Sequence, residues 1–345
     1  MSPQKIGRMS IAALLFAAVS ACAPNSPREG NDVRKCLTEC TSRMGVVSAF
    51  GAEADILLAE TSDRRTYKIN GNLFTTGILK GNRVVIVLTG VSIANATMIT
   101  QLMIDHFNVH HLLLTGIAGG VNPSNHIGDV IVPEKWSMPM EVYWNGDSNV
   151  PSPCGATGDL LCLGLRLSSF TNSPNSDYQT PTRNGQLGLG LFMRDTYILN
   201  NSNAPGGEYK FDYNVDAEML AVAKSISPQL DRCGPKNTKL CVSAQPRVRF
   251  GGRGISAPMF LANPHYRDYL FKTIQAQLID METAAFAHVA YANQIPFIAF
   301  RSLSDLAGAH DFTDVGAFFG SGLAESNEAR VTLSFLEAWA KKDGN

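Results

Sequence analysis

Short apolar runs alternate with amphipathic segments along most of the chain after residue 43. Continuous apolar runs of this length predict buried strands, and apolar residues at every third or fourth position predict helices. The predicted strands are 44–50, 66–80, 83–88, 111–115, 128–132, 247–252 and 297–300. The predicted helices lie around 56–58, 94–107, 216–225, 264–273, 285–292 and 315–342, the last with a break at 320–322. This alternation predicts one α/β domain, 44–345, whose mostly parallel, twisted mixed sheet is flanked by helices.

The stretch 278–309 carries two carboxylates around one helix–strand unit. Glu282 opens the predicted helix, and Asp305 follows the predicted strand 297–300. In open α/β sheets, ligands bind in the crevice beyond the carboxyl ends of the strands. Asp305 is therefore placed where chemistry would occur.

The pairs Met281-Glu282 and Ser304-Asp305 resemble two signatures of the nucleoside phosphorylase/nucleosidase superfamily. The resemblance is strongest to its 5′-methylthioadenosine/S-adenosylhomocysteine nucleosidases. It implies that Met281 and Glu282 bind the ribose, and that Asp305, beside Ser304, protonates the departing purine. The same resemblance implies a nucleoside phosphorylase-like fold without a metal or an organic cofactor.

The segment Thr115-Gly116-Ile117-Ala118-Gly119-Gly120 resembles the family's Thr-Gly-x-Ala-Gly-Gly signature. The resemblance implies that its backbone, including Ala118 and Gly119, lines the nucleoside site. A dinucleotide-binding loop would need a helix that opens directly on the glycines, and Pro123 and the strand at Gly128 follow too soon for one. The structural alternative is a plain tight turn.

Two acidic residues, Glu53 and Asp55, follow the first predicted strand. The family carries a catalytic Glu at this offset that activates the attacking water, and the spacing favours Glu53. A carboxylate here is also typical of a solvated loop or a helix cap. Arg301 completes the predicted catalytic set of Asp305, Glu53, Ser304 and Arg301, either as a neighbour of the active-site acid or as the partner of a surface carboxylate.

The segment 254–261 resembles the family's purine pocket. The resemblance implies that Phe260 stacks on the base and that the backbone of Leu261 reads its edge, whereas a lone Phe is commonly a core residue. Thr89, followed by Gly90, aligns with a Ser near the ribose. These residues complete the predicted substrate site.

Residues 138–245 are rich in Pro, Ser, Asn and Gly and show weak periodicity, so we interpret them as an insertion pinned by disulfides. The chain has seven cysteines, Cys22 and the local couples Cys36/Cys40, Cys154/Cys162 and Cys233/Cys241. If Cys22 carries lipid, an even number of cysteines remains. In an exported protein this predicts disulfides, although the sequence does not choose among the possible pairings. No His lies at metal-ligand spacing from these couples.

The first 21 residues form a predicted signal peptide, with Lys5 and Arg8 before an apolar run at 11–19. The sequence Val19-Ser20-Ala21-Cys22 resembles a bacterial lipobox, so we expect lipid on Cys22 and residence in the periplasm or cell envelope. We expect residues 22–43 to form a tether and an N-terminal segment. Cleavage nearby without lipid is the alternative. No run reaches the length of a transmembrane helix.

The composition of this 345-residue chain gives no electrostatic reason to expect a nucleic-acid partner, since the formal net charge is −1 and no basic stripe is present. The resemblance implies a purine nucleoside as the small-molecule partner and a homo-oligomer as the assembly. It leaves three functions open: a nucleosidase that uses water, a phosphorylase that uses phosphate, and a non-catalytic nucleoside-binding or storage-like protein. The acidic loop 50–55 contains no arginine to bind phosphate, which favours hydrolysis.

Overall fold

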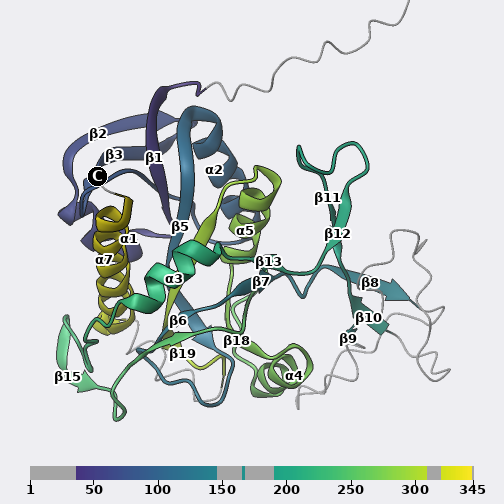
Figure 1. Ribbon diagram of the computed structural model, residues 1–345. Coiled ribbons are helices and arrows are strands. Elements are labelled where there is room, and N and C mark those ends of the chain that lie inside the picture. Colours follow the sequence, from purple (N-terminus) through teal and green to yellow (C-terminus); the bar gives the residue numbers. More distant parts are fainter. Residues whose placement is uncertain (1–35, 146–164, 168–189, 309–319, 344–345) are drawn as a thin grey trace, which may run out of the picture. The chain divides into compact units, whose positions relative to one another are not determined.

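The computed structural model describes residues 36–145, 165–167, 190–308 and 320–343 (Figure 1). Several sequence predictions lie outside these residues, namely the signal peptide, the lipobox at Cys22, the couple Cys154/Cys162 and the first residues of the final predicted helix. Within the described part of the chain, no helix is long and apolar enough to cross a membrane.

The main sheet is built around β5 (Phe107–Gly120). β1 (Glu39–Ser48) and β19 (Phe297–Asp305) both pair with β5 in parallel, and β4 (Asn82–Leu88) pairs in parallel with β1. The central residues of these strands are buried on both faces, which is why they appear in the sequence as continuous apolar runs. This centre confirms the predicted α/β fold with a mostly parallel mixed sheet.

Shorter strands extend the sheet on both sides of this centre. Beyond β4 lie the antiparallel β3 and β2, and beyond the end of β5 lie β18, β17, β7 and β13, while β6 joins β19 to β16. Their bounds are Ser62–Ile69 (β2), Asn72–Leu79 (β3), Val130–Val132 (β6), Lys135–Ser137 (β7), Tyr213–Asn214 (β13), Val248–Phe250 (β16), Arg253–Ser256 (β17) and Ala276–Asp280 (β18).

Helices pack on both faces of the sheet. α2 and α5 share one apolar cluster with one face, α1, α3 and α7 share a second cluster with the other face, and α4 packs in a third cluster with β17 and β18 (Figure 1). Their bounds are Gly51–Glu60 (α1), Ile93–His106 (α2), Ala217–Ser225 (α3), Pro264–Ile274 (α4), Thr283–Ala292 (α5) and Leu323–Asp343 (α7).

Two sequence predictions about strands are wrong in detail. β1 begins at Glu39, earlier than the predicted start at residue 44 and inside the predicted N-terminal segment. The predicted strand 66–80 is a hairpin of β2 and β3, because Asn70 and Gly71 both have positive φ, 47° and 82°, as a tight two-residue turn requires. The predicted strand 247–252 is confirmed as β16, and the separate strand β17 follows it after residues 251–252.

The predicted insertion is only partly separate from the domain. Its first half contains a small sheet of β8 (Val142–Asn145), β10 (Gly190–Met193) and β9 (Leu165–Leu167), followed by the ribbon of β11 (Thr196–Ile198) and β12 (Glu208–Lys210). Its second half is part of the domain, because β13 extends the main sheet and α3 packs beside α7. An interpretation of the whole of 138–245 as an added element is therefore wrong for α3 and β13.

Both cysteine couples within the described residues form disulfides. Cys36 pairs with Cys40, and Cys233 pairs with Cys241. The second bond closes the hairpin of β14 (Cys233–Gly234) and β15 (Asn237–Cys241). The prediction that these couples are oxidised is confirmed for both.

Candidate active site

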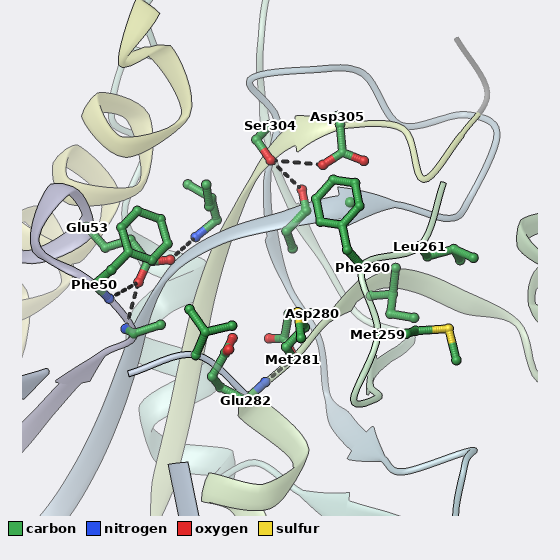
Figure 2. Close-up of a pocket in the computed structure, with 16 residues that line it drawn as sticks. Phe50, Glu53, Met259, Phe260, Leu261, Asp280, Met281, Glu282, Ser304 and Asp305 are labelled. Carbon is green, nitrogen blue, oxygen red and sulfur yellow. Dashed lines mark hydrogen bonds between the residues drawn. The ribbon is translucent and has the colours of Figure 1, made fainter. Parts of the chain in front are cut away.

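A cavity of about 200 Å³ lies where the carboxyl ends of β1, β5, β18 and β19 meet (Figure 2). Its lining combines acidic groups with a largely apolar wall. In Figure 2, Glu53 lies with Phe50 at one side, Ser304 and Asp305 lie with Phe260 at the other, and Glu282 lies below them. The lining residues are Ala49, Phe50, Glu53, Val91, Ile117, Ala118, Gly119, Met259, Phe260, Leu261, Ile279, Asp280, Met281, Glu282, Ser304 and Asp305.

Glu53 is buried in the first turn of α1, directly after the end of β1. One carboxylate oxygen, Oε2, accepts hydrogen bonds from the amides of Ala49 at 2.7 Å and Phe50 at 3.3 Å. The other, Oε1, accepts from the amide of Ile117 at 2.9 Å and from Arg301 Nη1 at 3.3 Å. Burial raises the pKa of Glu53 to about 7, and Arg301 and the amides oppose that rise. Asp55, the alternative from the sequence, is exposed.

Asp305 is the last residue of β19 and is also buried. Its Oδ1 accepts a hydrogen bond from the amide of Ala307 at 2.8 Å, and its Oδ2 accepts one from Ser304 Oγ at 3.0 Å. Within the described residues no cation pairs with it. Burial therefore raises the pKa of Asp305, and only these two hydrogen bonds oppose the rise. A carboxyl whose pKa is raised is better suited to donate a proton than an exposed one.

Glu282 lies between the other two carboxyls, immediately before α5. Its Oε1 accepts a hydrogen bond from the amide of Ser92 at 2.8 Å, and its Oε2 accepts one from Arg301 Nη2 at 3.3 Å. Burial raises its pKa, and Arg301 opposes this. Its neighbour Met281 presents an apolar side chain to the same cavity.

Arg301 does not line the cavity, but its guanidinium group contacts acidic residues that do. It is fully buried, with Nε 2.8 Å from Asp280 Oδ2 and with Nη1 and Nη2 on Glu53 and Glu282. The alternative that it pairs with a surface carboxylate is wrong. Its carboxylate partners do not include Asp305, so it stabilises the three other acidic residues of the cavity, and no cation among the described residues pairs with Asp305.

Asp280 is a lining residue that the sequence analysis missed as part of the site. It accepts hydrogen bonds from the amides of Glu282 at 3.2 Å and Thr283 at 3.1 Å, as well as from the hydroxyls of Ser256 and Thr283. It therefore fixes the start of α5, where Glu282 lies, and pairs with Arg301. The signal that could have found it was its position at the end of a strand, directly before the Met-Glu pair.

The predicted base-binding residues line the cavity. Phe260 is 50% exposed, so the alternative that it is a core residue is wrong, whereas Leu261 is buried. Thr89 and Gly90 do not line the cavity. The amide of Thr89 donates to Ser48 O at 2.9 Å, and Gly90 adopts a positive φ of 79°. The turn they form places Val91 in the lining instead.

The glycines predicted as a loop after a strand belong to β5 itself, which continues to Gly120. They allow the close approach of acidic side chains instead of forming a turn. A Cβ at Gly119 would lie 2.9 Å from Asp305 Oδ1, and one at Gly116 would collide with Glu53 Oε1 and Arg301 Nη1. The expectation that this segment lines the site holds for Ala118 and Gly119, whereas the alternative of a plain turn is wrong.

No group of three or more His, Cys, Asp or Glu side chains among the described residues has an arrangement that could hold a metal ion. The described cavity offers carboxyl groups in unequal surroundings. Asp305 accepts two hydrogen bonds and pairs with no cation among the described residues, whereas Glu53 accepts hydrogen bonds from four N–H donors, which favour its ionised form.

Comparison with known proteins places this arrangement in a family. The family model of the phosphorylase superfamily matches residues 43–337. A 5′-methylthioadenosine/S-adenosylhomocysteine nucleosidase from Mycobacterium bovis is 25% identical over 293 residues, which cover 85% of this chain and 96% of that protein. Bark storage protein A from Populus deltoides is 26% identical over 259 residues, 73% of this chain and 74% of that protein.

Solved structures agree on the fold. The structure of 5′-methylthioadenosine/S-adenosylhomocysteine nucleosidase from S. pneumoniae with a transition-state inhibitor matches with a TM-score of 0.56 and 19% identity. The match covers 88% of this chain and all of that one. Because the family model spans both the predicted insertion and the cavity residues, the chain belongs to the phosphorylase superfamily.

Proposed function

We propose that the protein hydrolyses the N-ribosidic bond of a purine nucleoside or a 5′-thio-nucleoside, to give the free base and the sugar. The observation that supports this proposal is that two carboxyls in one cavity have different surroundings. Asp305 is buried and pairs with no cation among the described residues, and Glu53 is buried against Arg301 and three amides. One group is thus prepared to give a proton and the other to accept one.

The reaction uses these groups in a defined order. When the C–N bond breaks, its electron pair moves to the purine, and Asp305 transfers its proton to a purine nitrogen. The oxygen of water bonds to the anomeric carbon from the opposite face of the sugar, and Glu53 accepts the proton that water loses. Opposed carboxyls with water beside one of them follow the logic of inverting glycosidases. Glu282 is placed to accept hydrogen bonds from the ribose hydroxyls.

The charge around Glu53 favours water over phosphate as the nucleophile. A phosphorylase must hold a phosphate dianion on the face of the sugar opposite the purine, usually with arginine or lysine. Here Arg301 is fully buried and already contacts Asp280, Glu53 and Glu282. A phosphate in the cavity would face Glu53 with no additional cation among its lining residues.

The apolar wall supports a nucleoside with an uncharged or thioether 5′ group. Phe50, Val91, Met259 and Met281 supply large apolar side chains to the cavity. The relative from Mycobacterium bovis is named for 5′-methylthioadenosine and S-adenosylhomocysteine, and the apolar wall is compatible with the first of these. We take 5′-methylthioadenosine as the first substrate to test.

A storage role is the second candidate, because bark storage protein A from Populus deltoides is a relative of similar identity. The buried carboxyls favour an enzyme, since Glu53, Glu282 and Asp305 all line the cavity at a cost in desolvation. A storage protein has no need for that cost.

The test is a nucleoside panel incubated with purified protein, in buffer with and without phosphate. We expect free base and free pentose from 5′-methylthioadenosine at the same rate in both buffers. Sugar 1-phosphate formed only with phosphate would identify a phosphorylase. No product from any nucleoside, combined with saturable binding, would favour a binding or storage protein.

We also propose that the mature protein is anchored through lipid on Cys22 in the bacterial periplasm or cell envelope, and that it is a homo-oligomer. The lipobox resemblance supports the anchor. Val91 is 47% exposed and Phe260 50% exposed at the cavity, and exposed apolar side chains of this size support coverage by a second copy.

A further inference from the structure

The helix α7 carries a buried acid that contacts the central strand β5. Glu328 is fully buried and does not line the cavity. Its Oε2 accepts a hydrogen bond from Thr115 Oγ1, which also lies 2.7 Å from Thr332 Oγ1 on the next turn of α7. Neither the proposed reaction nor the family resemblance uses this residue.

Glu328 is part of a buried polar layer between the sheet and α7. Ser48, Thr115 and Ser302 lie two residues after Val46, Leu113 and Phe300, which all pack in the apolar cluster of α7. Because side chains alternate along a strand, the three hydroxyls face α7 as well. The oxygens Ser48 Oγ, Ser302 Oγ and Glu328 Oε1 are buried, and none of them has a hydrogen-bond partner in the part of the chain that the structure describes. An acid proton on Oε1 would give this layer a donor.

The charges around Glu328 disfavour its ionised form. The negative charge of Glu53 on α1 acts on it, as does that of Glu325 one turn away on α7, and the positive charge of Arg301 on β19 opposes them. Arg301 already contacts three carboxylates, namely Glu53, Asp280 and Glu282. One guanidinium does not balance a fourth buried negative charge. Burial and the charge of Glu53 accordingly raise the pKa of Glu328 well above its ordinary value.

We propose that Glu328 is a positioning residue for Glu53, and that it keeps its proton throughout the reaction. Because a neutral acid does not compete for Arg301, the positive charge of Arg301 remains available to stabilise Glu53 and Glu282. Through Thr115 it fixes the part of β5 that presents the Ile117 amide, two residues later, to Glu53. This inference rests on the proposed role of Glu53 as the base.

The protonation of Glu328 can be measured without any turnover. Infrared spectra of the whole protein at pH 8, in H₂O and D₂O, should show the carbonyl stretch of a buried protonated carboxylic acid. Part of that band should be missing from Glu328→Gln, whereas Glu337→Gln, an exposed acid on the same helix, should leave the band unchanged. An identical band in Glu328→Gln and the unmodified protein would overturn the proposal.

Kinetics then test the positioning role. Glu328→Gln carries a neutral amide of the same shape, so kcat/KM should stay within about twofold and its acid limb should keep its position. Glu328→Ala removes the contact with Thr115, and kcat should fall about tenfold or more with KM nearly unchanged, because small misplacement of a reacting group is costly. The control Leu336→Ala opens a cavity under the same helix and should lower Tm without changing kcat.

Two results would overturn this role. An acid limb that moves to lower pH in Glu328→Gln would mean that Glu328 is normally ionised. A kcat in Glu328→Ala equal to that of Leu336→Ala would mean that Glu328 only fills space. If Glu328→Ala does not fold, the infrared band and the pH profile of Glu328→Gln still decide. No hydrolysis by the unmodified protein would refute the proposed function and leave the infrared test intact.

Discussion

The substitution Asp305→Asn should lower the catalytic rate while leaving the stability of the fold nearly unchanged. The amide oxygen of Asn can take the place of Oδ1 and accept from the amide of Ala307, as the carboxyl does at 2.8 Å. The amide nitrogen then faces Ser304 Oγ. That hydroxyl lies 3.3 Å from Ala118 O, so it can donate there and accept from the new nitrogen. Each hydrogen bond has a replacement, and no ion pair is lost.

The expected effects therefore differ in size between stability and rate. The free energy of unfolding should change by less than about 1 kcal/mol, because all polar groups keep partners. Turnover of a purine nucleoside should fall about 10²–10⁴-fold, the range for loss of a general acid, which is about 3–5 kcal/mol of activation free energy. KM should change little, since Glu282 and Phe260 still contact the ligand.

The assay compares two substrates with the same pair of proteins. 5′-Methylthioadenosine needs its base protonated, whereas a riboside with a nitrophenolate leaving group does not. Asp305→Asn should lose most of its activity on the first and much less on the second, with Tm as the control for folding. Equal losses on both substrates would mean that Asp305 acts in some other way, and full activity on the first would place the acid elsewhere.

Three further predictions concern pH, packing and export. The pKa of Glu53 is about 7 in the folded chain, above its ordinary 4.5, so kcat/KM should rise through pH 7. The stability that protonated Glu53 contributes, about 3 kcal/mol, should be complete below pH 4.5 and lost as pH rises through 7; thermal melts of Glu53→Gln should show a smaller loss. Gly116→Ala should cost about 10²-fold in turnover, because its methyl group collides with Glu53 and Arg301, whereas Gly320→Ala, with open space around it, should not. Cys22→Ser should release the protein from membranes or leave its precursor uncleaved, and unchanged membrane partition would refute the lipid anchor.

The strands and helices near the site could be predicted because burial on both faces leaves a direct trace in the sequence. The run 297–300 and the helix after Glu282 have the predicted types in β19 and α5. The continuation of β5 through its glycines could not be predicted this way. Glycine is usually read as a turn residue, and its use here depends on side chains that approach from other elements.

The candidate site was predictable where neighbouring residues form a motif. Met281-Glu282 and Ser304-Asp305 are such pairs, and the cavity contains all four. The partners of Arg301 were not predictable, because Glu53 lies 248 positions away in the sequence and no local pattern joins them. Asp280 and Glu328 were missed for the same reason, since a buried acid and a solvated one look alike in a sequence.

The energetics of the cavity favour an enzyme over a protein that serves only for storage. Burying an ionisable group without full compensation costs free energy, and natural sequences keep such groups where function requires them. Asp305 is buried with two hydrogen bonds and no cation among the described residues, and Glu53 has a pKa of about 7 despite four donors. An apolar residue in place of Asp305 would remove its desolvation cost and would break no ion pair among the described residues. Their opposite environments, one suited to giving a proton and the other to receiving it, are what hydrolysis of an N-ribosidic bond requires.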